Sequence, residues 1–262
     1  MRILLVSDVH ANIYALRAIE RAERWDEVWC CGDLVDFGPF PVEVIRWMQA
    51  HHARCVRGNH DVHVLAIRRE DCRRAYDERQ WQWAHQNLEQ LMEQDLDYLR
   101  ALPDTLCLEA DGIRYQMQHQ FDNGYATVES LNQFRTFWKG GEDLPVRRLL
   151  FGHTHRRGMH MLDENTHWLN PGSASYRRPD DPDKRAHYMM LENGAVRFGA
   201  ISYDRSALLA KTSKYLREGR MLSTHLQDAF FFFGNATTTR SPLPMENRDL
   251  NGGDRHDASA GD

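Results

Sequence analysis

The residues of this 262-residue chain best suited to chemistry form four short polar clusters, each following an apolar run. The clusters are Asp8-Val9-His10, Gly32-Asp33, Gly58-Asn59-His60-Asp61 and Gly152-His153-Thr154-His155. A fifth candidate, His119, follows the run Ile113–Gln118. Carboxylate oxygens, an amide oxygen and neutral imidazoles suit hard and borderline divalent ions better than thiolate-seeking ones. These residue types therefore indicate a metal site.

The number of candidate ligands bears on how many ions the site holds. Seven side chains are available: Asp8, His10, Asp33, Asn59, His119, His153 and His155. A carboxylate that follows a central strand, here Asp33, can bridge two ions roughly 3.5–4 Å apart. Two such ions need seven or eight ligand positions, and a bridging residue counts twice. The set is therefore large enough for a two-metal centre.

Each cluster also has a purely structural interpretation. An Asp-x-His after a strand can simply form a turn, and Gly-Asn-His-Asp can be a turn followed by a helix N-cap. Alternating histidines after a buried strand, as at His153 and His155, have little structural purpose. Because all four clusters follow strands in this order, the metal interpretation is favoured over four unrelated turns.

The elements that must position these clusters can be predicted from apolar spacing. The runs predicted as buried strands are Ile3–Val6, Val28–Cys31, Arg54–Val56 and Arg148–Phe151. Helical spacing occupies Asn12–Arg24 and Val42–Ala50. Alternation of strands and helices predicts a parallel sheet covered by helices. Ligands of such sheets bind beyond the carboxyl ends of the strands, where these clusters lie.

The rest of the chain is predicted to be mixed in structure. Residues 62–101 contain no Gly or Pro and are predicted to form helices that cap the site or buttress it. Predicted strand pairs are Thr105–Glu109 with Ile113–Gln118, Gly158–Leu162 with His167–Leu169, and Ala186–Leu191 with Ala195–Ile201. Further helices are expected at 127–138 and 206–218, and a disordered tail at 236–262.

Composition narrows the possible partners. The net charge of −5 gives no broad attraction to nucleic acid or to an anionic membrane. The chain lacks a run of ~18 apolar residues, and its N-terminal apolar run is too short for a signal peptide. Its five cysteines include no C-x-x-C pair, so we expect reduced thiols and a cytoplasmic location. The apolar run Phe230–Phe233 is either a docking surface for a homo-oligomer or the buried end of the last helix.

The clusters together resemble the calcineurin-like metallophosphoesterase superfamily. The stretches SDVHAN, CGDLVDFGP, VRGNHD, FGHTH and NPGS are most similar to its small prokaryotic phosphodiesterase branch, and the match covers residues 3 to about 203. The resemblance implies an α/β fold, a four-layer α-β-β-α sandwich of two mixed sheets flanked by helices. It also implies a metallophosphoesterase domain over residues 1–235, with 62–101 as a cap-like helical insertion.

The resemblance further implies a role for each site residue. One ion would be held by Asp8, His10, Asp33 and His155, and the other by Asp33, Asn59, His119 and His153. His60 matches the catalytic histidine that protonates the leaving oxygen. Manganese is the expected ion, with Fe, Ni, Zn and Mg as alternatives. Where the family usually has His-Gly, this chain has His119-Gln120.

The expected activity is hydrolysis of small, nucleotide-like phosphodiesters. Protein phosphatases and dinucleoside polyphosphate hydrolases are the alternative, but they usually carry an Arg where GDLVDFG has Phe37. A non-enzymatic scaffold is disfavoured because every expected ligand and His60 are present.

Three roles stay open at this level. Arg57 either contacts substrate or forms a salt bridge. Asp61 either orients His60 or caps a helix. The aromatic residues Trp81, Trp83, Tyr98 and Phe121 either stack on a base or pack in the interior. A processive nuclease is not expected, given the acidic balance.

Overall fold

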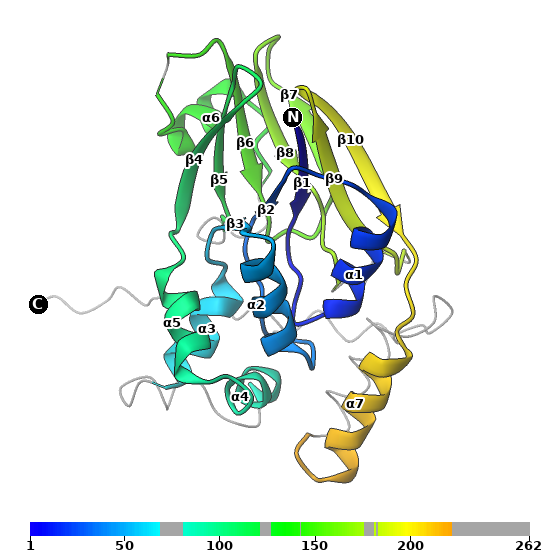
Figure 1. Ribbon diagram of the computed structural model, residues 1–262. Coiled ribbons are helices and arrows are strands. Elements are labelled where there is room, and N and C mark those ends of the chain that lie inside the picture. The colour runs from blue at the N-terminus through cyan, green and yellow to red at the C-terminus, as the bar shows by residue number, and fades with distance from the viewer. Residues whose placement is uncertain (69–80, 121–126, 142, 176–180, 182, 222–262) are drawn as a thin grey trace, which may run out of the picture.

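Two mixed β-sheets face each other in the computed structural model, with helices on their outer faces (Figure 1). The structure describes residues 1–68, 81–120, 127–141, 143–175, 181 and 183–221. The first sheet has the strand order β10-β9-β1-β2-β3 and the second β4-β5-β6-β8-β7. This arrangement confirms the predicted sandwich of two mixed sheets.

The first sheet combines parallel and antiparallel strands. Its strands are β1 (Arg2–Val6), β2 (Glu27–Cys30), β3 (Arg54–Cys55), β9 (Ala186–Glu192) and β10 (Ala195–Ile201). Strands β1, β2 and β3 are parallel, as the strand–helix alternation predicts. The simpler expectation of a wholly parallel sheet is wrong, because β9 enters beside β1 in the opposite direction and turns back as β10.

The second sheet has parallel strands at its centre. Its strands are β4 (Thr105–Ala110), β5 (Ile113–Gln118), β6 (Val146–Phe151), β7 (Gly158–Met161) and β8 (Thr166–Asn170). The pair β4–β5 is the predicted hairpin around Asp111-Gly112, and β7 pairs antiparallel with β8. Between these edges, β5, β6 and β8 run parallel. Both sheets therefore have parallel strands whose carboxyl ends can meet.

Alternating side chains of β1 fill two separate apolar layers. Ile3 and Leu5 pack between the two sheets, whereas Leu4 and Val6 pack beneath the helices on the outer face. A strand covered on both faces has apolar residues at successive positions, which is why this run shows no polar alternation. Across the inner layer, the rings of Trp29 and Tyr115 meet edge to face with centroids 5.1 Å apart.

Helices cover the outer faces of both sheets. The first sheet is covered by α1 (Ile13–Ala22) and α2 (Pro41–Ala50), and α7 (Ser206–Arg217) adds side chains to the same apolar layer. The side chain of Asn12 caps α1 by accepting from the Ala15 N–H, and Pro41 begins α2. On the second sheet lies α6 (Leu131–Phe137), shorter than the predicted helix over 127–138 because Ser130 caps its start.

Three described helices begin within the Gly-Asn-His-Asp cluster or in the segment after it, up to Ala101. They are α3 (Asn59–Ile67), α4 (Gln82–Leu88) and α5 (Glu93–Ala101). Trp83, Leu96 and Leu99 are buried in the same apolar layer as the outer face of β1 and β2. These helices therefore pack as part of the domain. Their role as a cap over the site stays a prediction.

Some predictions fall outside the described residues. These concern the tail 236–262, the run Phe230–Phe233 and Phe121. Among the helices that the structure does describe, none is both long enough and apolar enough to cross a membrane.

The inner layer generates a stability prediction. Leu5 is fully buried between the sheets, so Leu5→Ala should lower the free energy of unfolding by roughly 2–5 kcal/mol. Met161→Ala is the control, because that side chain is 68% exposed and its loss should change stability by less than about 0.5 kcal/mol. Denaturant titration followed by circular dichroism measures both. Equal, small losses in the two variants would contradict the two-layer core.

Candidate metal centre

The predicted ligands gather where the two sheets present the carboxyl ends of their parallel strands. Asp8 follows β1, Asp33 follows β2, and Asn59 begins the helix after β3. From the second sheet, His119 directly follows β5, and the Gly-His-Thr-His cluster follows β6. All seven side chains are buried. The structure thus brings together residues that lie up to about 150 positions apart in the chain.

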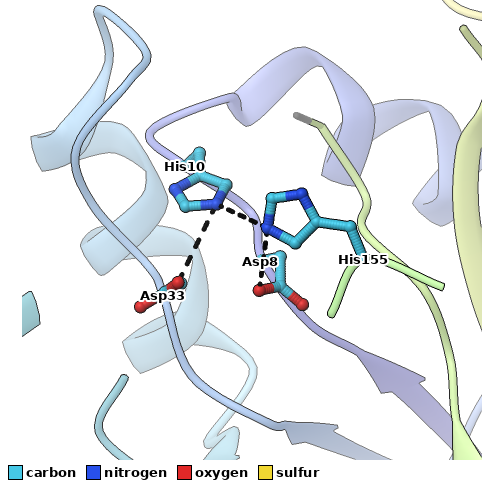
Figure 2. A group of neighbouring side chains, drawn as sticks. All are labelled: Asp8, His10, Asp33 and His155. Atoms are coloured by element: carbon cyan, nitrogen blue, oxygen red, sulfur yellow. Dashed lines mark hydrogen bonds and ion pairs between the residues drawn. The ribbon is translucent and has the colours of Figure 1, made fainter. Parts of the chain in front are cut away.

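Four of the seven form one close group (Figure 2). Potential ligand atoms of Asp8, His10, Asp33 and His155 all lie within 4.8 Å of one another. The Nε2 atoms of His10 and His155 are 3.3 Å apart, and His155 Nε2 is 3.2 Å from Asp8 Oδ1. His10 Nε2 lies 3.9 Å from Asp33 Oδ2. Donor atoms that converge in this way can hold a divalent ion.

A second group shares Asp33 with the first. The Asn59 Oδ1 atom lies 3.0 Å from His119 Nε2 and 3.2 Å from His153 Nδ1. His119 Nε2 lies 3.1 Å from Asp33 Oδ2, the same oxygen that faces His10. One carboxylate oxygen therefore stands between both groups, the position that a bridging ligand requires.

The two buried carboxylates keep unused acceptor capacity. Asp8 Oδ2 is buried and has no hydrogen-bond partner among the described residues, and buried Asp33 Oδ2 faces only imidazole nitrogens, those of His119 at 3.1 Å and His10 at 3.9 Å. Asp33 Oδ1, in contrast, accepts from the His60 N–H at 2.9 Å, and Asp8 Oδ1 from the His153 N–H at 3.1 Å. Burying a carboxylate oxygen without a donor is costly, and a bound cation would compensate it. The donor set fits divalent metal ions.

His119 is oriented for ligation by a backbone contact. Its Nδ1 lies 2.6 Å from the carbonyl oxygen of Cys31. Because a carbonyl can only accept, Nδ1 carries the proton, and a neutral ring then offers the lone pair of Nε2 to the second group. The following Gln120 has φ of 62°, a left-handed conformation that glycine adopts more readily. Gln120 thus adopts a conformation that would be less strained for glycine, the residue expected at this position from the resemblance.

The backbone is left-handed at most of these ligands. Asp8, His10, Asp33, His153 and His155 all have φ between 46° and 65°. Such conformations cost a non-glycine residue on the order of 1 kcal/mol or more, and persist where the surrounding structure enforces them. Strain collected at one point in this way is typical of functional sites.

The Asp61 carboxylate holds two ligand loops together. It accepts backbone N–H bonds from Asp33 at 3.1 Å, Leu34 at 2.9 Å and Gly58 at 2.9 Å. Of its two predicted roles, the structure favours the cap. Burial and the nearby charge of Asp33 raise the pKa of Asp61 to about 7, against these N–H donors.

The group that orients His60 is Asp36, which sequence reasoning missed. Asp36 Oδ2 lies 2.8 Å from His60 Nδ1, and both side chains are buried. The signal was present as the second aspartate of GDLVDFG. Next to it, the Phe37 ring packs against the rings of His60 and His10, with centroids 4.7 and 5.4 Å away. An apolar ring thus occupies the position at which protein phosphatases and dinucleoside polyphosphate hydrolases are expected to carry an Arg.

Another set of side chains lies next to the two groups. Potential ligand atoms of Asp36, His60 and His63 also fall within 4.8 Å of one another. This set lacks Asp33 and already contains the Asp36–His60 contact. This set competes with the group around Asn59 as the position of a second ion. A variant of His63 distinguishes these two positions.

Electrostatics keep the carboxylates of the centre ionised. Burial opposes ionisation of Asp33, but charge interactions with His119 and His60 hold its pKa well below the ordinary value. Burial likewise opposes ionisation of Asp8, whose pKa is lowered to about 2 chiefly by His155. In return Asp33 raises the pKa of His119 to about 9, against burial. A metal ion would take the place of that shared proton.

Two other ring ligands stay neutral. Burial lowers the pKa of His10 to about 3, although Asp33 opposes the shift. Burial and the charge of His119 lower the pKa of His153 to about 3. Neutral imidazole is the form that ligates metal.

The remaining sequence candidates contact other parts of the chain. Arg57 donates to Asp104 Oδ1 at 2.7 Å, and its substrate-binding role stays a prediction. Trp83 is buried, and the Tyr98 hydroxyl contacts the Cys55 sulfur at 3.7 Å, so both pack in the interior. Trp81 is partly buried and meets the His63 ring edge to face at 4.6 Å.

Comparison with known proteins agrees with this geometry. Residues 1–194 match the family model for the calcineurin-like phosphoesterase superfamily domain. The chain therefore belongs to the calcineurin-like phosphoesterase superfamily, as its motifs predict.

Curated relatives match a shorter stretch. The symmetrical bis(5'-nucleosyl)-tetraphosphatase of Klebsiella pneumoniae is 41% identical over 73 residues, 26% of each chain. The enzyme of the same name from Chromobacterium violaceum is 44% identical over 54 residues, 20% of each chain. The chain thus spans about a quarter of these relatives or less.

Solved structures match over most of the chain. A metallophosphoesterase from Sphaerobacter thermophilus shares 25% identity with a TM-score of 0.65, over 87% of this chain and 98% of that one. A hypothetical protein, PH1004 from Pyrococcus horikoshii OT3, has a TM-score of 0.68 at 14% identity, over 89% and 98% of the two chains. The second likeness concerns the fold alone.

Close packing of the ligand loops generates a second prediction. A Cβ on Gly58 would lie 2.1 Å from Asp33 Oδ1 and 2.4 Å from the Asp33 backbone nitrogen. We expect Gly58→Ala to displace Asp33 and to lower the free energy of unfolding by about 1–3 kcal/mol. Gly158→Ala is the control, since its Cβ would make only an ordinary 3.5 Å contact with Trp168. Thermal unfolding of the metal-free variants measures the difference. A Gly58→Ala protein as stable as the control would refute the close approach.

Proposed function

We propose that this protein is a two-metal hydrolase of phosphoesters. The observation that carries the proposal is the buried Asp33 oxygen that faces two groups of metal-ligand atoms at once. One ion would be held by Asp8, His10, Asp33 and His155, the other by Asp33, Asn59, His119 and His153. When bound there, two divalent ions would supply positive charge against an anionic phosphoester and would lower the pKa of a bound water.

The chain's own contribution to the reaction centres on His60. As bond cleavage pushes negative charge onto the leaving oxygen, protonated His60 donates a proton to it through Nε2. Its Nδ1 is directed at Asp36 Oδ2, 2.8 Å away, and this contact fixes the ring and supports its positive charge. The Phe37 ring and the neighbouring His10 ring contact the His60 ring and limit its rotation.

Small, nucleotide-like phosphodiesters are the substrate class that we favour. Membership of the superfamily supports phosphoester chemistry, and the tetraphosphatase relatives support a nucleotide-like group. Those relatives also favour a dinucleoside polyphosphate as the second candidate. Phe37 argues against that candidate and against a phosphoprotein, because it cannot bind a phosphate group bidentately as a guanidinium does.

We further propose manganese as the ion, since oxygen and imidazole donors suit it, with Fe, Ni, Zn and Mg as competitors. A cytoplasmic location is supported by the described cysteines Cys30, Cys31, Cys55 and Cys107, which are free thiols. Arg57 remains a candidate substrate contact at the rim if its salt bridge to Asp104 opens.

The proposed acid role of His60 can be tested directly. With manganese present, His60→Ala should lower kcat for diphenyl phosphate by roughly 10²-fold or more, because phenolate leaves poorly without a proton. Bound metal should remain at two ions per chain, since His60 is not a proposed ligand. His160→Ala, on β7, is the control and should retain turnover. Undiminished hydrolysis by a folded His60→Ala protein would remove His60 from the mechanism.

Metal stoichiometry distinguishes the two positions for the second ion. We expect His153→Ala to reduce bound manganese from two ions to about one per chain, because it removes a donor from the group around Asn59. The matched variant His63→Ala should retain two, because it alters only the competing Asp36–His60–His63 set. Elemental analysis after equilibrium dialysis measures both. The reverse outcome would assign the second ion to the competing set.

A further inference from the structure

The loop that carries Asp36 has an unfavourable backbone. Asp36 and Phe37 are consecutive left-handed residues with φ of 70° and 54°. Neither is a glycine, so each is in a conformation that persists only where the surrounding structure enforces it. A loop with two such residues needs an external partner to hold it in one conformation. Together with the Phe37 N–H, which donates to Asp36 Oδ1 at 2.7 Å, that partner determines where the Asp36 carboxylate lies relative to His60.

The side chain of Asn87, in α4, makes two hydrogen bonds to this loop and a third within its own helix. Its Oδ1 accepts from the Asp36 N–H at 3.0 Å, and its Nδ2 donates to the Gly38 carbonyl at 2.8 Å. The second Nδ2 proton goes to the carbonyl of Trp83, one helical turn earlier, at 3.0 Å. Since an N–H can only donate and a carbonyl can only accept, these partners fix the amide's orientation.

On the side away from Asn87, the loop packs closely against the backbone after β1. A Cβ on Gly38 would lie 2.1 Å from the His10 carbonyl oxygen, so the backbone there already touches the ligand loop after β1. The Phe40 N–H donates to the Ala11 carbonyl at 3.0 Å. The loop is thus held between the metal centre and the fully buried Asn87 side chain.

We propose that Asn87 is a positioning residue for proton transfer, acting through Asp36 on His60. The inference rests on the proposed function, because it assumes that His60 protonates the leaving group. It gives α4, part of the segment 62–101, a role in catalysis without any contact with metal or substrate. Without Asn87 the strained loop relaxes, the Asp36 carboxylate moves, and His60 loses its orientation.

Two kinetic consequences separate this role from general support of the fold. The loss should fall on kcat, with KM and bound metal unchanged, since neither the metal ligands nor the substrate surface is altered. It should also depend on the leaving group. Diphenyl phosphate, which releases a basic phenolate, should suffer more than bis(4-nitrophenyl) phosphate, which releases a stable anion that needs little protonation.

The test is a double-mutant cycle of Asn87→Ala and His60→Ala with both substrates and manganese. Asn87→Ala alone should lower kcat for diphenyl phosphate by roughly 10-fold or more, and by less for the nitrophenyl ester. In the His60→Ala background it should have no further effect beyond about twofold, because residues that act as a unit are non-additive. If Asn87→Ala does not fold, Asn87→Ser takes its place in the cycle.

Gln86→Ala is the matched control. Gln86 is the preceding residue of α4, it is also buried, and its Oε1 has no hydrogen-bond partner among the described residues. Its loss should leave the leaving-group dependence unchanged. Equal losses from Asn87→Ala with and without His60, or the same effect from Gln86→Ala, would overturn the role of Asn87. A wild-type protein that hydrolyses neither ester under any of the five metals would instead refute the proposed function.

Discussion

Two carboxylates buried without enough donors are the constraint on which the rest of the structure depends. Asp8 and Asp33 lie at the meeting point of the two sheets. Asp8 Oδ2 has no hydrogen-bond partner among the described residues, and Asp33 Oδ2 faces only imidazole nitrogens. In an apolar interior this arrangement is unfavourable unless cations stand nearby. The folded chain provides only partial compensation, through His119 and His155. A divalent ion would complete the compensation, so this arrangement of carboxylates is less favourable in the metal-free fold.

Around these carboxylates, backbone groups do most of the positioning. The Asp61 carboxylate joins the loops after β2 and β3 through their N–H groups, and the Cys31 carbonyl sets the tautomer of His119. From the second sheet, Asn170 of β8 donates to the Gly152 carbonyl at 2.8 Å and steadies the Gly-His-Thr-His loop. Left-handed residues can persist in these loops because such contacts leave them few alternatives.

The strands and the polar clusters that follow them were predicted from the sequence, because each forms a recognisable local pattern. Apolar runs such as Ile3–Val6 and the clusters after them predicted the strands, the edge of the sheet and the seven side chains that gather there. The antiparallel entry of β9 beside β1 was not readable, since a buried strand shows the same composition in either direction. Asp36 and Asn87 were missed because their roles arise from contacts 24 and 51 residues apart. Hydrogen bonds of that kind have no signature in local spacing.

The proposed metal ligands and the proposed proton donor are positioned by different elements of the fold. All seven proposed ligands follow sheet strands, so they depend on the shared sandwich. The orientation of His60 depends in addition on the Asp36 loop, which is held by a helix outside both sheets. If His60 protonates the leaving group as we propose, changes in α4 would alter proton delivery while the metal ligands stay in place. On this proposal, metal binding and leaving-group protonation would be separable properties of one site, the first set by the sheets and the second by a helical segment packed against them.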